Sequence, residues 1–135
     1  MMGILHPDEI EDLLHGHHLG HLACVADGRP YLVPIAYVYD GGALYGRTLP
    51  GRKIAALRAN PAVCFEVTAP ADPHTWRSVV VEGVFEEVMD SAEREAVQAL
   101  LSRIAETVWR TDDGIVFRVR VDAKQGRWLR IGQER

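Results

Sequence analysis

The order of apolar and polar residues along the chain predicts three helices. The first is expected to start within residues 5–10, where Pro7 and a pair of acidic residues suit a first turn, and to end at Gly16 and Gly20 after apolar residues at helical spacing. A second helix, of about two turns, is expected over Arg52–Ala59, where an Asn-Pro pair stops it. The third begins after a cap at Asp90 and continues to about Val108.

Between the helices, runs that are rich in β-branched and aromatic residues predict strands. Asp27-Gly28 and Gly41-Gly42 have the composition of tight hairpin turns, so the first three strands are expected to form an antiparallel meander. Gly83 lies inside a long run and predicts a bend or a bulge. The expected strands are residues 22–26, 31–39, 43–47, 62–68, 76–88, 115–121 and, as a last short strand, 126–131.

These elements predict a fold that is α+β and mainly β. Six or seven antiparallel strands with about three peripheral helices favour a closed or nearly closed barrel, because closure removes exposed sheet edges. The length of 135 residues is that of one domain, and no repeat or linker divides residues 1–135.

Composition narrows the class of function. The net charge of −4 argues against general binding to DNA or RNA, which needs a basic surface. No apolar stretch is long enough to span a bilayer, and the N-terminus lacks the features of a signal peptide. Cys24 and Cys64 both lie in apolar runs and are expected to be buried thiols in a reducing compartment, which indicates the cytoplasm.

The candidate chemistry is concentrated where the third strand ends and the second helix begins. Arg52 and Lys53 open this helix after a Pro-Gly turn, although cations at a helix N-terminus oppose the dipole. A bound anion would explain the placement, because a helix N-terminus offers free N–H groups and a positive dipole end. With the hydroxyl of Thr48, these cations form a candidate phosphate site. The alternative is that both are solvated surface charges.

Four blocks of sequence stand out in order along the chain, namely residues 28–40, 45–53, 60–67 and 76–83. Together they resemble the pyridoxamine 5'-phosphate oxidase-like flavin-binding split barrels. The chain is more similar to the short subgroup of that family, which includes nitroimidazole-resistance and flavin-nucleotide-binding proteins, than to the longer oxidases. The resemblance covers about residues 7–90 and is specific to the superfamily rather than to one activity.

The resemblance implies a split barrel that binds flavin mononucleotide (FMN) in each of two clefts of a homodimer. It places the phosphate at the start of the second helix and the flavin ring along a strand edge, with the next strand and a C-terminal tryptophan completing the site. The residues assigned to the cofactor in this way are Arg52, Lys53, Thr48, Arg47, Val33, Pro34, Ile35, Ala36, Trp76, Ser78, Val79 and Trp128.

Two departures from the family pattern limit what the resemblance implies about activity. Many relatives carry an aromatic-histidine pair where this chain has Gly46-Arg47, so the histidine linked to nitroimidazole reduction is replaced. Arg47 would pair with the phosphate, reach the flavin or face solvent. The chain is also shorter than the pyridoxamine phosphate oxidases. Residues 118–135 show no match to their substrate-binding region, which argues against vitamin B6 oxidation.

A histidine-rich segment follows the first helix and consists of His15, His17, His18 and His21. No neighbouring carboxylate or cysteine completes a set of zinc ligands, so no metal site is expected. Histidines near a helix C-terminus interact favourably with its dipole. Haem binding, which occurs in some split-barrel relatives, would need one axial histidine from this segment.

We therefore expect an FMN-binding homodimer that acts as a small oxidoreductase. A reduced nicotinamide would deliver hydride to the flavin, which would pass the electrons to a small acceptor. No side chain is assigned a catalytic role. The alternatives are a flavin carrier or sensor without turnover, a deazaflavin-binding barrel and a haem-binding barrel. Neither a nucleic acid nor a membrane is expected as a partner.

Overall fold

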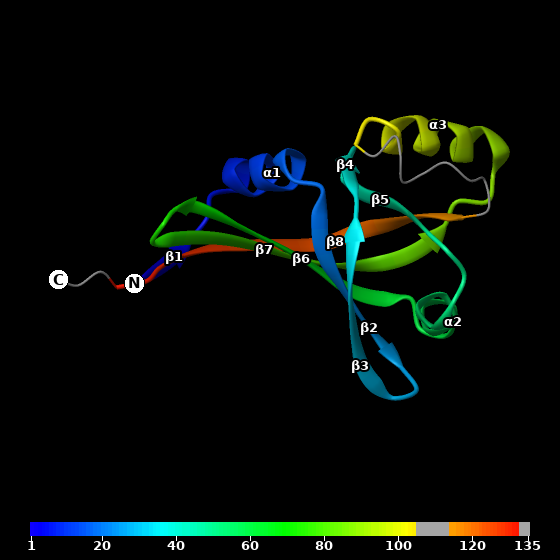
Figure 1. The fold of residues 1–135 in the computed structure, drawn as a ribbon, viewed down its shortest axis with the longest axis horizontal. Helices are drawn as coiled ribbons and strands as arrows, with labels where there is room; N and C mark the ends of the chain where they lie inside the picture. The colour runs from blue at the N-terminus through cyan, green and yellow to red at the C-terminus, as the bar shows by residue number, and fades with distance from the viewer. Residues whose placement is uncertain (105–113, 133–135) are drawn as a thin grey trace.

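The computed structural model describes residues 1–104 and 114–132, which form an eight-stranded sheet and three helices (Figure 1). The strands are β1 (Met2–Ile4), β2 (Leu19–Ala26), β3 (Arg29–Ala36), β4 (Val38–Asp40), β5 (Ala43–Thr48), β6 (Ala62–Asp72), β7 (Thr75–Glu87) and β8 (Ile115–Arg130). The helices are α1 (Pro7–Gly16), α2 (Arg52–Ala59) and α3 (Ser91–Leu101). The predicted class, mainly β with three helices, is confirmed, and the strand count exceeds the predicted six or seven.

The sheet is antiparallel, with the strand order β3-β2-β6-β7-β8-β5-β4 and β1 added to β8. Its two edge strands, β3 and β4, follow each other in the chain and are separated only by Tyr37. The chain therefore passes from one edge of the sheet to the other at this residue. Among the described residues no ladder joins β3 to β4 or β5, so the barrel stays split along this line.

Several strand boundaries differ from the prediction. The predicted meander is confirmed in part: β2–β3 and β4–β5 form the two expected hairpins. It is wrong in joining them, because β5 pairs with β8 and, among the described residues, not with β3. Tight turns determine which neighbours form hairpins, but not which distant strand completes the sheet. Residues 31–39 form two strands because the chain changes edge within them. β6 continues to Asp72 and β7 begins at Thr75, so their hairpin is longer than the predicted strands 62–68 and 76–88. The two predicted C-terminal strands are one strand, β8.

The N-terminal strand was not predicted, and one helix is shorter than expected. β1 is only three residues long and takes its place from its pairing with β8, which no local pattern reveals. α3 ends at Leu101, and residues 102–104 of the predicted extension form a turn instead. The remainder, to Val108, lies outside the described part of the chain. None of the described helices is both long and apolar enough to cross a membrane.

Two clusters of buried side chains hold the helices against the sheet. The larger cluster includes Leu13 and Leu14 of α1, Leu57 of α2 and Phe65 of β6. The smaller one packs α3 against β5 and β8. Figure 1 shows α1 and α3 on one side of the molecule, while the β2–β3 hairpin projects to the other. The side of β1, β2, β3, β6, β7 and β8 that is turned away from the buried core is called the outer face below.

The bulge expected at Gly83 is confirmed. Glu82 pairs with Ala123 and Gly83 with Val121, so Asp122 is an extra residue in β8. At this point the two backbones approach closely, because a Cβ on Gly83 would lie 2.3 Å from the carbonyl oxygen of Arg120. Gly83 therefore marks a position where the close approach of β7 and β8 leaves no room for a side chain.

We expect Gly83→Ala to lower the free energy of unfolding by about 1–3 kcal/mol, because the β8 backbone must move to admit the methyl group. Urea unfolding would measure the loss. Gly16→Ala is the matched control, since no atom lies within 4 Å of a Cβ at the end of α1. Equal stabilities for the two variants would contradict the close approach of β7 and β8.

Candidate functional site

The start of α2 lies beside β3. Gly51 caps the helix and offers no side chain to its first-turn N–H groups, which have no intrahelical acceptors. The guanidinium of Arg52 lies 5.1 Å from the centre of the Tyr31 ring, in a cation–π contact. The first turn of the helix is therefore held next to β3 and combines free N–H groups with a positioned cation.

Lys53, the next residue, is half-buried and faces β2. Burial lowers the pKa of its ammonium group, and the nearby Cys24 side chain opposes this shift. Burial likewise raises the pKa of the Cys24 thiol. A bound phosphate would favour the charged form of Lys53 and offset the cost of its burial. Lys53 is thus a cation whose surroundings favour an anionic partner.

Thr48 and Arg47 lie on opposite faces of β5. Thr48 is half-buried, and its hydroxyl donates only a long hydrogen bond of 3.4 Å to the carbonyl of Leu49. Arg47 is 7% exposed and packs against Gly114, where a Cβ would lie 2.3 Å from Nε. Its Nη2 has no hydrogen-bond partner among the described residues. The structure therefore excludes a solvent-facing Arg47 and places it on the α3 side, apart from Arg52 and Lys53.

The strand segment expected along the flavin ring is the C-terminal half of β3. Ile35 is buried and Val33 packs against the core, whereas Pro34 is exposed and Ala36 is half-buried. Among the described residues β3 pairs only with β2, so the backbone groups along its other edge remain available. The start of α2 lies on the β3 side of the split, because Arg52 contacts Tyr31 of β3 and α2 packs against β2.

The remaining predicted residues do not lie together. Trp76 and Ser78 point to the outer face, whereas Val79 is fully buried in the core. Trp128 points to the face opposite its neighbour Arg127, and its indole packs over Gly3, where a Cβ would lie 2.4 Å from Nε1. Of these four predicted residues, Trp76 and Ser78 share a surface that a ligand can reach.

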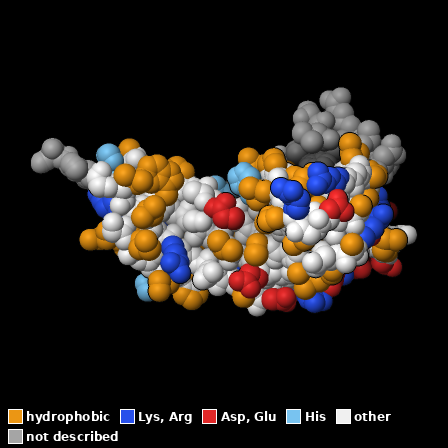
Figure 2. Space-filling view, turned by 90° about the horizontal axis from the view of Figure 1, so that it is seen from below, with side chains coloured by type: hydrophobic (Ala, Val, Ile, Leu, Met, Phe, Trp, Pro, Cys, Tyr) orange, Lys and Arg blue, Asp and Glu red, His pale blue; other side chains and the backbone are white. Residues whose placement is uncertain are grey.

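That surface is a hollow of about 480 Å³ on the outer face, near the free end of the β6–β7 hairpin. Its walls are mainly apolar, with one arginine and two hydroxyls. Figure 2 views the molecule from the side that carries the outer face and shows hydrophobic side chains gathered over this end. The hollow is lined by Met2, Thr68, Trp76, Ser78, Arg127, Leu129 and Ile131.

Sequence reasoning missed Glu66, which lies next to this hollow. Its carboxylate accepts hydrogen bonds from Ser78 Oγ, at 2.9 Å, and from the hydroxyl of Thr68. His21 Nδ1 lies 3.6 Å from the other carboxylate oxygen. The spacing of Glu66 and Thr68 could have indicated this pair, because residues two apart in a strand lie on the same face.

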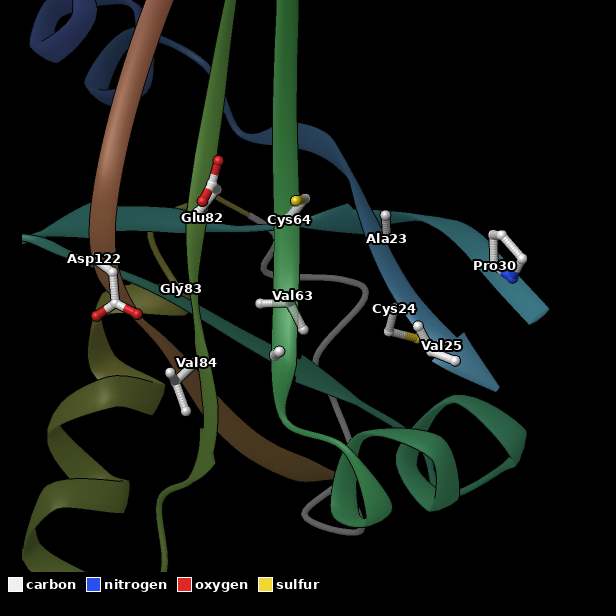
Figure 3. Close-up of a pocket in the computed structure, with 11 residues that line it drawn as sticks. Ala23, Cys24, Val25, Pro30, Val63, Cys64, Glu82, Gly83, Val84 and Asp122 are labelled. Atoms are coloured by element: carbon white, nitrogen blue, oxygen red, sulfur yellow. The ribbon is translucent and has the colours of Figure 1, made fainter. Parts of the chain in front are cut away.

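A second hollow, of about 490 Å³, lies at the other end of the outer face (Figure 3). Cys64 and Glu82 project from neighbouring strands there, and Asp122 comes from the bulge in β8. The prediction that both cysteines are buried is wrong for Cys64, which is exposed although its strand is apolar. Alternation explains the error, because Val63 and Phe65 turn inward and leave Cys64 outside.

The histidine-rich segment does not converge on one point. Ring nitrogens of His17 and His18 bond the carbonyls of Leu13 and Tyr37, at 3.0 and 3.2 Å. His15 packs edge-on against Tyr39, and His21 faces Glu66. Within residues 1–104 and 114–132, no group of three or more histidine, cysteine or acidic side chains is placed to hold a metal ion.

The open antiparallel barrel, with a cationic helix start beside an unpaired strand edge, defines a split-barrel protein with a candidate anion site. The chain belongs to the family described as pyridoxamine 5'-phosphate oxidase, whose model matches residues 6–131. A curated relative, "Uncharacterized protein RA0666" of Rhizobium meliloti, is 36% identical over 85 residues, which are 63% of this chain. The match spans 56% of that relative's length.

Solved structures show the same architecture. A FAD-binding protein from Mesorhizobium loti is 32% identical, with a TM-score of 0.85 over 96% of this chain and 99% of its own. The FAD-binding protein from Mycobacterium smegmatis is 28% identical, with a TM-score of 0.74 over 95% and 98%. A Bacteroides thetaiotaomicron protein whose name refers to 5-nitroimidazole antibiotic resistance is 20% identical, with a TM-score of 0.81 over 95% and 87%. It shares the fold alone.

Proposed function

We propose that the protein binds FMN as a homodimer and acts as a small flavin-dependent oxidoreductase in the cytoplasm. The observation that carries this proposal is the start of α2, whose N–H groups receive no side-chain cap from Gly51 and where Arg52 lies beside β3 and half-buried Lys53 follows it. Two cations next to free helical N–H groups suit a phosphate monoester. The unpaired edge of β3 suits the polar rim of a planar ring. The names of the M. loti and M. smegmatis relatives support a flavin and make FAD the main alternative.

The placement of the predicted residues supports a dimer. Tyr31, which contacts Arg52, faces the core, whereas Trp76 and Ser78 lie on the outer face. Tyr31 pairs with Cys24, one step beyond the Ala23–Cys64 pair, and Trp76 pairs with Pro70, so about seven steps along β6, or roughly 23 Å, separate their levels. One protomer therefore does not enclose a flavin between these groups. A second copy whose outer face covers the split would bring them together.

The outer face has the character of a protein interface. Large exposed hydrophobic side chains are spread over its strands, and patches of this kind mark sites of association. Both hollows lie on this face, so a partner would cover them together. The large exposed hydrophobic side chains include Met2, Ile4, Leu19, Val25, Leu32 and Leu129.

The residues of the chain would bind and orient the cofactor rather than move protons. Arg52 and Lys53 would hold the phosphate, with Thr48 beside them, while the backbone of Val33–Ala36 would contact the ring edge. Trp76 and Ser78, contributed by the partner, would cover the ring and exclude water. When bound, the flavin would supply hydride acceptance from a reduced nicotinamide and electron transfer to a small acceptor.

The test is the visible absorption spectrum of the purified protein, before and after incubation with excess FMN and dialysis. We expect two flavin bands that survive dialysis and bleach when NADH or NADPH is added. Bands that no nicotinamide bleaches would support a flavin carrier instead of an oxidoreductase. A Soret band, or a protein that retains no flavin, would contradict the proposal.

A further inference from the structure

The hydroxyl groups of the outer-face hollow have a fixed hydrogen-bond polarity. Ser78 Oγ donates to Glu66 Oε2 at 2.9 Å, and the hydroxyl of Thr68 donates to the same oxygen. Ser78 of β7 and Thr68 of β6 pair across the strands and both line the hollow. Glu66 lies two residues before Thr68, on the same outer face, and next to the hollow. Glu66 therefore acts on the hollow through two residues that a ligand can touch.

A hydroxyl group carries one proton and two lone pairs, while an ionised carboxylate only accepts. When the hydroxyls of Ser78 and Thr68 both donate to Glu66, each hydroxyl oxygen has only its lone pairs left to offer a ligand. The hollow then presents acceptors from these two positions, in walls that are otherwise apolar apart from Arg127, whose guanidinium only donates. A ligand with an N–H or O–H group can donate a hydrogen bond to these acceptors, whereas a ligand with acceptors alone leaves them unpaired.

We infer that Glu66 is a positioning residue that makes the hollow select a planar, largely apolar ligand with an N–H donor. This inference rests on the proposed function, in which the hollow of the partner covers the flavin ring. The oxidised flavin ring carries a single N–H, at N3. Ser78 and Thr68 thus form the acceptor pair for the N3 hydrogen, and Trp76 supplies an aromatic wall of the same hollow.

His21 completes the surroundings of Glu66. Its Nδ1 lies 3.6 Å from Oε1, the oxygen that the two hydroxyls leave free. The His21 side chain is 50% exposed and that of Glu66 34%, so solvent reaches this side of the carboxylate. The hydroxyl side, by contrast, faces the hollow. The direction of the two hydroxyl bonds therefore depends on Glu66 being an acceptor, and removing its charge is the informative change.

The test compares the binding of FMN and of N3-methyl-FMN, measured by quenching of flavin fluorescence. We expect the unaltered protein to bind FMN at least tenfold more tightly, because methylation removes the donor and leaves the acceptors unpaired. In Glu66→Gln the side-chain amide can donate a hydrogen bond to Ser78. The Ser78 hydroxyl is then free to donate its own hydrogen bond to the ligand. This variant should lose the preference, and the absorption bands of its bound flavin should shift.

Glu82→Gln is the matched control, because Glu82 is an exposed carboxylate on the same face that lines the other hollow. It should keep the preference. If Glu66→Gln does not fold, Ser78→Ala with Thr68→Val tests the same acceptors and should also abolish the preference. Equal affinities of the unaltered protein for the two flavins, or a preference that both altered proteins retain, would overturn this inference alone. Failure of the unaltered protein to bind FMN would overturn the proposed function and the inference with it.

Discussion

Replacing Arg52 and Lys53 together with alanine is expected to weaken FMN binding by at least about a hundredfold while leaving the fold intact. Charge-assisted hydrogen bonds contribute on the order of 1.5–3 kcal/mol each, and about 1.4 kcal/mol corresponds to a tenfold change in affinity. Arg52 is exposed, and Lys53 is a half-buried cation without a resolved ion-pair partner among the described residues. Little of the folding free energy therefore depends on either charge.

The affinity would be measured by titrating apoprotein with FMN and following flavin fluorescence, with circular dichroism as the check on folding. Arg58→Ala is the matched control, because Arg58 is an exposed cation on the same helix that pairs with Glu87 at 2.8 Å. It removes one positive charge from α2 without touching the helix start. Unchanged affinity of the double variant for FMN would contradict the assignment of Arg52 and Lys53 to the phosphate.

Val80→Arg should dissociate the dimer and abolish flavin binding in the same step. Val80 is half-buried in the middle of the outer face, where it pairs with Glu66 on one side and Gln125 on the other. A symmetric interface would bury the substitution twice, and desolvating each guanidinium costs several kcal/mol even with Glu66 as its cross-strand neighbour. We expect the dimer to weaken by at least about a hundredfold at the corresponding cost of roughly 3 kcal/mol.

Light scattering at micromolar concentration would report the mass, and dialysis against FMN would report the cofactor. Met89→Arg is the control, since Met89 is equally apolar and 80% exposed but lies between β7 and α3, outside the outer face. A monomeric unaltered protein would contradict the dimer. A Val80→Arg monomer that still retains FMN would show that one protomer builds the whole site.

The local parts of the fold could be predicted from the sequence because local chemistry determines them. α2 begins and ends at the predicted residues, since a Gly cap precedes it and an Asn-Pro pair follows it. Asp90 caps α3 as expected, with its carboxylate accepting from the backbone N–H of Glu93 at 3.0 Å. The bulge at Gly83 was also readable, because a glycine inside a long strand marks a close backbone approach.

The distant pairings could not be predicted in the same way. Nothing in residues 43–48 indicates that β5 pairs with β8 rather than β3, because both partners offer alternating apolar strands. For the same reason the sequence leaves the direction of Arg47 open, and only the pairing of β5 with β8 shows that its side chain lies toward α3. Glu66 escaped notice because its role depends on Ser78, twelve residues away and on another strand.

The pairing of β1 with β8 has a consequence for how the chain folds. Gly3 faces Trp128, and the N-terminal amino group donates to the carbonyl of Arg130 across 129 residues of sequence. Contacts this far apart close a large loop, and the entropy lost in closing it is regained only when most of the sheet is formed. β1 therefore docks late, and until then the apolar outer face stands next to an incomplete sheet edge. This places the protein among slowly folding β topologies, in which the partly folded chain is prone to aggregate.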